Sequence, residues 1–225
     1  MVYERRRRRR LNPRFVILCA AGALLAAGGI WLLVSALGGG HEPEGKDIPV
    51  PEYVVQDYLP ENQWSRPGEA LEKIKGVVIH YVGNPGTTAQ ANRNYFASLA
   101  EGKEETYASS HFVIGLEGEV IQCVPLTEIA YASNSRNSDT VSIEVCHPDE
   151  GGEFTEESYR RCVELTAWLC ETFRLDPEKD VIRHFDVTGK RCPLYYVEHP
   201  ESWRDFLRDV AAEKEALREA EKEAG

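Results

Sequence analysis

The chain has 225 residues, with 26 basic and 37 acidic side chains and a net charge of −11 when histidine is neutral. The charge is uneven, because residues 1–37 hold seven arginines and one acid, which leaves 19 basic and 36 acidic residues after them, a net charge of −17. A segment with this much negative charge repels the phosphate backbone of a nucleic acid, so we expect no nucleic-acid partner.

The N-terminus predicts a membrane segment. Residues 1–14 form a basic stretch that includes six consecutive arginines, and Phe15–Leu37 is an uncharged apolar run long enough to cross a bilayer as a helix. The basic flank stays in the cytoplasm, so we expect a single-pass protein of the cell membrane with its main domain outside the cytoplasm. Cleavage as a signal peptide stays open, because Val34–Ala36 resembles a cleavage site, although the run is longer than a signal core.

The rest of the chain divides by composition. Residues 38–51 are rich in glycine, proline and charge and are typical of a linker. Residues 52–210 have the size of one domain. Residues 211–225 form a tail of Glu, Lys and Ala, either a solvated helix extension or disordered.

Two extended segments open the domain. Tyr53–Leu59 is the first, and the β-branched run Lys75–Tyr81 is a buried strand with His80 at its C-terminal end. A turn containing glycine follows His80. In an α/β fold such turns expose functional groups.

A β-hairpin comes next. Ser110–Ile114 and Glu119–Val124 are apolar runs joined by a connection containing glycine. His111 points to the sheet face opposite Phe112. It is either a further polar group of a site or a hydrogen-bonded sheet histidine.

Thr140–Cys146 is a strand with clean alternation. Its apolar residues share one face, and Glu144 lies on the other. A glutamate inside an apolar strand is costly to bury. Glu144 is therefore either paired with a cation or works as an acid or base.

Three helices complete the domain. The first, Thr88–Leu99, is expected to bury Ala91, Tyr95, Phe96 and Leu99. The second begins at the cap residue Thr155 and ends near Phe173. The last is amphipathic and ends near residue 210.

Between the last two helices, Arg183–Pro193 places an imidazole, an ammonium and a thiol within eleven residues: His184, Lys190 and Cys192. Imidazole and thiolate are good zinc ligands, and a catalytic zinc usually has three protein ligands. A third ligand must then come from elsewhere. On spacing alone, a hydrogen-bonded loop histidine and a buried cysteine remain the alternative.

Five cysteines lie beyond the apolar run. If Cys192 binds metal, the other four form two disulfides or are free core thiols: Cys123, Cys146, Cys162 and Cys170.

Four separated pieces share one family resemblance. Val78–His80, Ser110–Ile114, Val141–Glu144 and Arg183–Pro193 resemble, in this order, segments of the type 2 zinc-dependent N-acetylmuramoyl-L-alanine amidases, relatives of the peptidoglycan recognition proteins and phage amidase lysozymes. The resemblance implies an α/β fold, with a central mixed sheet flanked by helices and one zinc ion in a groove at the strand ends.

The resemblance also implies residue roles. His80, His184 and Cys192 correspond to the zinc ligands, Glu144 to the catalytic carboxylate and Lys190 to the lysine beside it. The implied reaction is hydrolysis of the amide bond between N-acetylmuramic acid and the L-alanine of the stem peptide. Peptidoglycan is then the partner, and we expect a monomer. The alternative is a non-catalytic peptidoglycan-binding receptor, which the presence of the cysteine disfavours.

The chain departs from the family pattern in two places. Many members have a Trp-His-Ala-Gly-like segment where this chain has Ala130–Asn134, so a histidine that helps to hold substrate is absent or displaced. Some members use a tyrosine where this chain has Ser110. This second departure favours Glu144 as the proton-handling group.

Overall fold

The computed structural model describes residues 48–103 and 105–224. The basic segment 1–14, the apolar run Phe15–Leu37 and the linker up to residue 47 lie outside these residues. Within the described ranges, no helix has the length and apolar character needed to cross a membrane.

A six-stranded mixed sheet forms the centre of the fold, in the order β1-β4-β3-β5-β2-β6. β3 and β4 form the predicted antiparallel hairpin, and the other four neighbouring pairs are parallel. The strands are β1 (Val54–Gln56), β2 (Val77–Tyr81), β3 (Phe112–Ile114), β4 (Val120–Gln122), β5 (Val141–Val145) and β6 (Val181–Arg183).

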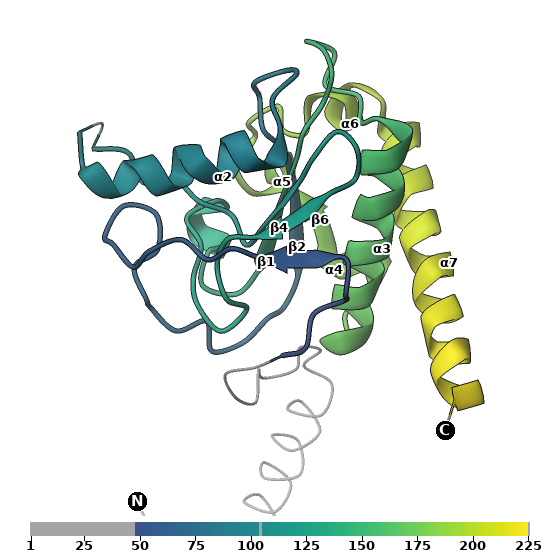
Figure 1. Ribbon diagram of the computed structural model, residues 1–225. Coiled ribbons are helices and arrows are strands. Elements are labelled where there is room, and N and C mark those ends of the chain that lie inside the picture. Colours follow the sequence, from purple (N-terminus) through teal and green to yellow (C-terminus); the bar gives the residue numbers. More distant parts are fainter. Residues whose placement is uncertain (1–47, 104, 225) are drawn as a thin grey trace, which may run out of the picture. The chain divides into compact units, whose positions relative to one another are not determined.

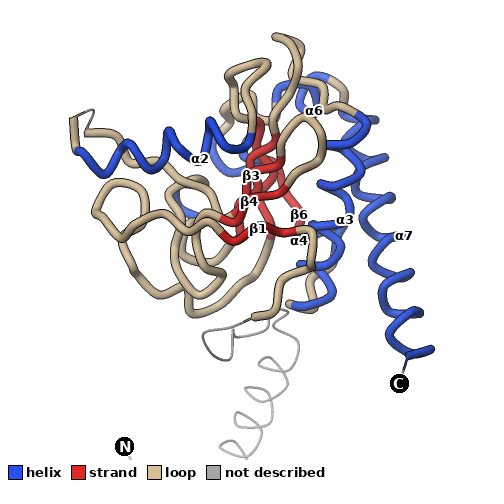
Figure 2. The backbone as a smooth tube through the Cα atoms, viewed as in Figure 1, coloured by secondary structure: helices blue, strands red, loops and turns tan. Residues whose placement is uncertain are grey.

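Helices cover both faces of the sheet (Figures 1 and 2). α3 lies against one face with α7 beside it, and α2 lies on the other face. The helices are α2 (Ala89–Ser98), α3 (Glu156–Thr172), α4 (Pro177–Asp180), α5 (His184–Thr188), α6 (Leu194–Glu198) and α7 (Pro200–Ala224), with 3-10 turns η1 (Leu99–Glu101) and η2 (Asn134–Arg136).

The strand alternation explains the two apolar cores. Val141, Ile143 and Val145 of β5 are buried in the core shared with α3 and α7. Cys146 belongs to the second core, which also includes Phe96 of α2. The predicted alternation of this strand is confirmed, and it leaves Glu144 on the face opposite the valines.

The predicted caps are confirmed, and the buried face predicted for the first helix is right for Phe96 and Leu99 but wrong for Ala91 and Tyr95. Thr88 accepts a hydrogen bond from the backbone of Ala91, as an N-cap residue does. Ala91 is exposed and Tyr95 is 44% exposed, whereas Ala89 and Phe96 are buried. Residues seven apart return to the same side of a helix, so Ala89 and Phe96 define the buried face and Tyr95 is turned away from it.

The charged tail is helical. α7 continues without a break through Ala224. Leu217 packs against the main core, and the ammonium of Lys214 donates a hydrogen bond of 2.7 Å to the carbonyl of Leu175. The tail therefore contacts the domain that precedes it.

Within the described residues, the cysteines other than Cys192 are buried free thiols: Cys123, Cys146, Cys162 and Cys170. Burial raises the pKa of each thiol to about 12. The core-thiol alternative holds for these residues, and the two-disulfide alternative does not.

Candidate metal centre

Three neighbouring strands deliver the candidate site residues to one edge of the sheet. β2 lies between β5 and β6 and is parallel to both, so the C-terminal ends of these strands meet. His80 pairs with Glu144, and Ile79 pairs with Arg183, which places His184 at the adjacent strand end where α5 begins. Strand register therefore brings two histidines and a carboxylate together.

A tight reversal after α5 brings in the thiol. α5 ends at Gly189, which has φ +78°, a left-handed conformation that glycine adopts without strain. The backbone N–H of Phe185 then donates to the carbonyl of Cys192 at 2.9 Å. As a result, Cys192 Sγ lies 3.8 Å from His80 Nδ1.

His80, His184 and Cys192 form a buried cluster whose potential ligand atoms all lie within 4.8 Å of one another. The two imidazole rings are 4.6 Å apart between centroids. The three residues that the sequence predicted as ligands are thus brought together from distant parts of the chain.

The chemistry of the cluster fits a metal. His184 Nδ1 is buried and has no hydrogen-bond partner among the described residues, which is rare for a buried polar atom. The Nε2 atoms are both engaged, because His80 Nε2 lies 3.1 Å from Ser133 Oγ and His184 Nε2 lies 3.1 Å from Asn134 Oδ1. The Nδ1 atoms of the two histidines and the thiol form a donor set that suits zinc with an open coordination position.

The electrostatics keep both imidazoles neutral. Burial lowers the pKa of His80, and the neighbouring His184 and Lys190 lower it further. Burial and Lys190 also lower the pKa of His184. Burial and Glu144 raise the pKa of the Cys192 thiol to about 12, against the opposing effects of the Tyr81 backbone N–H and Lys190. A divalent cation bound between them would favour the thiolate.

Glu144 stands beside the cluster without a cationic partner. Its Oε1 lies 3.8 Å from His80 Nδ1, and its side chain is 17% exposed. Its Oε2 is buried without a hydrogen bond, and no ion pair joins it to Lys190 within the described ranges. Burial raises the pKa of this carboxyl to about 8, although Lys190 acts to lower it.

The cluster lies in a groove of about 440 Å³. Glu144 and Lys190 line it together with the three potential ligands. One wall is aromatic and uncharged, with Phe96, Tyr107 and Tyr131. The rings of Tyr107 and Tyr131 meet edge to face at 5.6 Å, and Tyr107 is 58% exposed.

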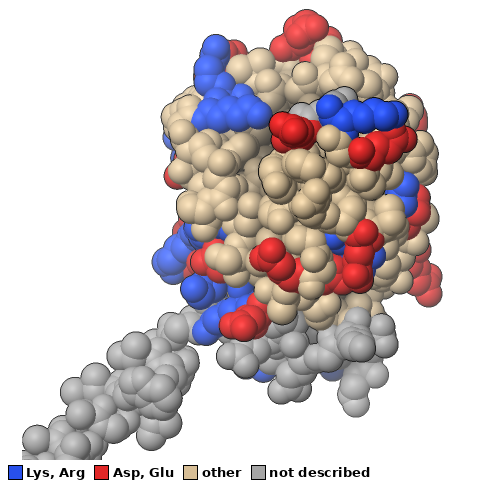
Figure 3. Space-filling view, turned by 90° about the vertical axis from the view of Figure 1, so that its left-hand side faces the viewer, with Lys and Arg blue, Asp and Glu red and all other residues tan. Residues whose placement is uncertain are grey.

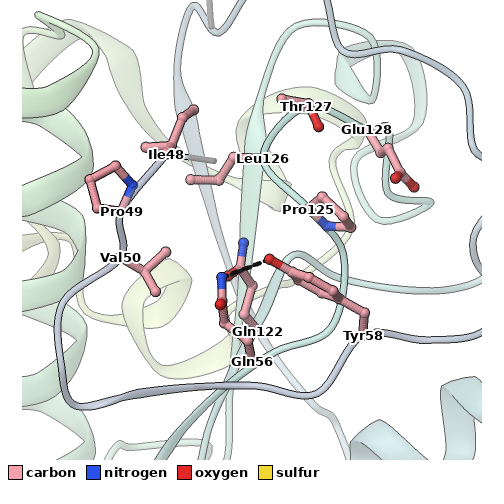
Figure 4. A pocket seen from close by; sticks show the side chains of 10 residues that line it. All are labelled: Ile48, Pro49, Val50, Gln56, Tyr58, Gln122, Pro125, Leu126, Thr127 and Glu128. Carbon is pink, nitrogen blue, oxygen red and sulfur yellow. Dashed lines mark hydrogen bonds between the residues drawn. The ribbon is translucent and has the colours of Figure 1, made fainter. Parts of the chain in front are cut away.

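A larger cavity of about 630 Å³ lies along β1 and β4 (Figure 4). In this cavity the side chains of Gln56, Tyr58 and Gln122 hydrogen-bond to one another, as the close view shows. Glu128 at its margin is engaged by both a 2.7 Å contact from Arg66 Nε and one from Arg66 Nη2. The cavity contains none of the predicted ligands, so the groove is the better candidate site.

His111 is a structural histidine. Its Nδ1 accepts a hydrogen bond from the backbone N–H of Ser142 at 3.0 Å, and its Nε2 lies 3.0 Å from the carbonyl oxygen of Glu128. Both ring nitrogens are therefore engaged by the sheet and the following loop. Of the two alternatives for His111, the hydrogen-bonded sheet histidine is confirmed.

Ser133 and Asn134 are site residues that the sequence did not predict. They belong to the segment that departs from the family pattern, and their side chains contact the two histidines. The polar loop composition was visible in the sequence, but nothing in it indicates which side chain the loop reaches.

The sequence profile described as N-acetylmuramoyl-L-alanine amidase matches residues 70–194, more than half of the chain. The chain belongs to the N-acetylmuramoyl-L-alanine amidase family. The matched region of this amidase-family chain contains all five predicted site residues: His80, Glu144, His184, Lys190 and Cys192.

Two Bacillus proteins are among its relatives. The chain is 31% identical to N-acetylmuramoyl-L-alanine amidase BlyA of Bacillus subtilis (strain 168), over 70% of this chain and 47% of the relative. It is 30% identical to N-acetylmuramoyl-L-alanine amidase CwlL of Bacillus licheniformis, over 70% of this chain and 46% of the relative. The chain spans about half the length of the curated relatives it matches.

Solved structures share the fold. A mutant endolysin from Bacillus subtilis superposes with a TM-score of 0.59 at 24% identity, covering 70% of this chain and 97% of that one. The Staphylococcus aureus hydrolase AmiA, in complex with its ligand, superposes with a TM-score of 0.54 at 18% identity, covering 77% of this chain and 87% of that one. The predicted mixed sheet flanked by helices is therefore the fold of these proteins.

Proposed function

We propose that this protein hydrolyses the amide bond between N-acetylmuramic acid and the L-alanine of the stem peptide in peptidoglycan. The observation that carries the proposal is the buried cluster of His80, His184 and Cys192, with the unpaired carboxylate of Glu144 beside it. Family membership supports the same reaction.

One zinc ion per chain, held by the two Nδ1 atoms and the thiolate, would supply a Lewis acid that polarises the amide carbonyl and makes a water more acidic. The remaining tasks fall to side chains of the groove.

Glu144 is the proposed proton carrier. Its carboxylate would accept the proton of the attacking water and deliver it to the departing amine of L-alanine. The free Oε2 leaves one oxygen available for the water.

Lys190 is the proposed electrostatic stabiliser. Its ammonium is exposed in the groove that contains the metal cluster. A positive charge there would stabilise the negative charge that develops on the carbonyl oxygen during attack. Attack followed by collapse releases a glycan strand and a free peptide.

The uncharged aromatic wall suits the glycan part of the substrate. Tyr107 and Tyr131 present ring surfaces on which the apolar faces of a sugar can stack, and neither brings a charge. On the face shown in Figure 3, charged side chains gather mainly in the upper and lower parts and form no continuous basic patch among the described residues.

The proposal is tested by metal analysis and by product release. The purified chain is assayed for zinc by elemental analysis and for newly freed amines from purified peptidoglycan, before and after chelation and again after zinc is returned. One zinc per chain and amine release that disappears with the chelator and returns with zinc are the expected results. Stoichiometric zinc and retention on peptidoglycan without amine release would instead support the receptor alternative.

We also propose that Phe15–Leu37 anchors the protein in the cell membrane, with residues 1–14 in the cytoplasm, the linker 38–51 and the domain 52–210 with its tail 211–225 outside. The length and apolar character of the run and the arginines before it support this orientation. The full chain carrying an N-terminal tag should stay in the membrane fraction after a high-salt wash. Release of an untagged domain would indicate cleavage.

A further inference from the structure

A single polar turn, Ser133–Asn137, contacts both histidines of the metal cluster. Ser133 Oγ lies 3.1 Å from His80 Nε2, and Asn134 Oδ1 lies 3.1 Å from His184 Nε2. In His80 the contacted nitrogen is the one that does not face Cys192, and in His184 it is the one other than the buried Nδ1, which has no partner in the described part of the chain. The turn is far from either histidine in sequence, so its contacts are tertiary.

The turn keeps its shape through its own hydrogen bonds. Asn137 Oδ1 accepts from the backbone N–H of Ser133 at 2.6 Å and from that of Ala132 at 3.2 Å. Asn134 has φ +51°, in the left-handed region that asparagine tolerates better than most residues. The Oγ of Ser133 and the Oδ1 of Asn134 are therefore presented in fixed positions before any metal binds.

The Asn134 contact sets which nitrogen of His184 carries hydrogen, and the Ser133 contact is compatible with the same arrangement in His80. An amide oxygen only accepts, so His184 Nε2 must hold the hydrogen and His184 Nδ1 must keep its lone pair. Ser133 is 1% exposed, and its hydroxyl, 3.1 Å from His80 Nε2, is able to accept a hydrogen bond from that nitrogen in the same way. The lone pair of His80 Nδ1 then faces Cys192 Sγ at 3.8 Å, and His184 Nδ1 keeps its lone pair in a buried position with no partner among the described residues.

We propose that the Ser133–Asn137 turn is a positioning element that holds both imidazoles in the tautomer and orientation that bind zinc. This inference rests on the metal site of the proposed function. It also gives a role to the segment in which this chain departs from the family pattern: the residues that stand there supply acceptors for the two ligand histidines.

The expected size of the effect follows from the usual cost of removing a hydrogen-bond partner from a metal-bound histidine. Such removal costs about 10–100-fold in metal affinity. The contact of Ser133 is buried and that of Asn134 is only partly buried, so Ser133→Ala should weaken zinc binding more than Asn134→Gly. Glycine at position 134 accepts the left-handed backbone and removes only the side chain.

The test uses the full chain, stripped of metal, and measures zinc affinity by competition with a chromophoric chelator. Ser133→Ala should raise the zinc Kd by about 10–100-fold and Asn134→Gly by about 10-fold or less. Asn134→Asp keeps an acceptor oxygen at this position, so its zinc affinity should be at least as high as that of the original protein. Ser135→Ala is the matched control, because this exposed serine lies in the same turn and its side chain makes no hydrogen bond within the described structure.

A second readout separates positioning from general destabilisation. With cobalt in place of zinc, the visible absorption bands of Ser133→Ala should change in energy and intensity, whereas those of Ser135→Ala should match the original protein. If Ser133→Ala fails to fold, the zinc affinities of Asn134→Gly and Asn134→Asp still test the inference, because position 134 is exposed.

Equal zinc affinities and identical cobalt spectra for the original protein, Ser133→Ala and Asn134→Gly would overturn the inference and leave the proposed function intact. Absence of zinc binding by the original protein would overturn both.

Discussion

Glu144 and His80 are direct neighbours across the parallel pair β5 and β2, and Glu144 Oε1 lies 3.8 Å from His80 Nδ1. The register of these strands therefore sets the distance between the proposed proton carrier and a proposed metal ligand. A shift of one residue would move Glu144 to the opposite face of the sheet, because side chains alternate along a strand.

Replacing Glu144 with glutamine should leave zinc content and fold unchanged and lower kcat for amine release. Removal of a general base typically costs about 10²–10⁴-fold, and the amide cannot carry the proton. Steady-state kinetics on soluble peptidoglycan fragments measure the loss. The exposed Glu178→Gln in α4 is the control and should keep normal turnover, while near-normal turnover of Glu144→Gln would contradict the assigned role.

Replacing Cys192 with serine should remove zinc and activity together, because a hydroxyl is a far poorer zinc ligand than a thiolate. Elemental analysis of the purified variant measures the loss directly. Cys162→Ala provides the comparison, since this buried thiol lies in the α3 core and not in the groove. A Cys192→Ser protein that retained one zinc per chain would show that the thiol is not a ligand.

Replacing Lys190 with alanine should lower kcat by about 10²–10³-fold with little change in zinc content, as expected for the loss of a group that stabilises charge in the transition state. The neighbouring Arg191 pairs with Glu198 and does not line the groove, so Arg191→Ala should have a small effect. Equal losses for the two variants would indicate that general positive charge matters here, and not the lysine itself.

Acid should destabilise the protein through His111. Burial lowers its pKa to about 4, although Glu128 acts to raise it, and a proton on Nδ1 would face the backbone N–H of Ser142. The unfolded chain binds this proton near pH 6.5 and the folded chain only near pH 4, so stability is lost as the pH falls through this window, by about 3 kcal/mol.

Urea unfolding of the zinc-loaded protein at several pH values measures this dependence. In His111→Gln the change in unfolding free energy between pH 6.5 and pH 4 should be smaller by about the same amount. An unchanged pH dependence would show that His111 is not the group responsible.

Deleting residues 211–225 should destabilise the domain. The deletion removes the packing of Leu217 on the core and the hydrogen bond from Lys214 to the carbonyl of Leu175. We expect a loss of roughly 2 kcal/mol in the free energy of unfolding, and about 1 kcal/mol for Leu217→Ala alone. Unchanged stability after the deletion would show that the tail does not contribute to the stability of the domain.

Local patterns in the sequence were enough for the elements that depend on near neighbours. The alternation of Thr140–Cys146, the cap at Thr88 and the glycine-bearing connection of the hairpin all act within a few residues, and the structure has each of them. The face of α2 was harder, because two apolar stripes were available. The sheet selected Phe96 and left Tyr95 exposed.

The clustering of His80, His184 and Cys192 could be predicted because the resemblance joined separated motifs. The spacing of His184 and Cys192 alone was a weak signal. The partners of the histidines could not be predicted. Ser133 and Asn134 reach the rings only after η2 has been placed beside β2 and α5, and no local pattern encodes that approach. The role of His111 could not be decided from the sequence for the same reason, because both of its hydrogen-bond partners come from other segments.

The distance along the chain between the clustered residues also fixes when the centre can form. His80 and Cys192 are separated by 112 positions, yet they meet in the folded domain. A ribosome must therefore release nearly the whole domain before the cluster can close, and a chain that is interrupted before Cys192 carries an incomplete donor set. If the cluster binds zinc as proposed, the ion can be bound only after most of the domain has been synthesised, and an unfinished chain would lack the proposed activity.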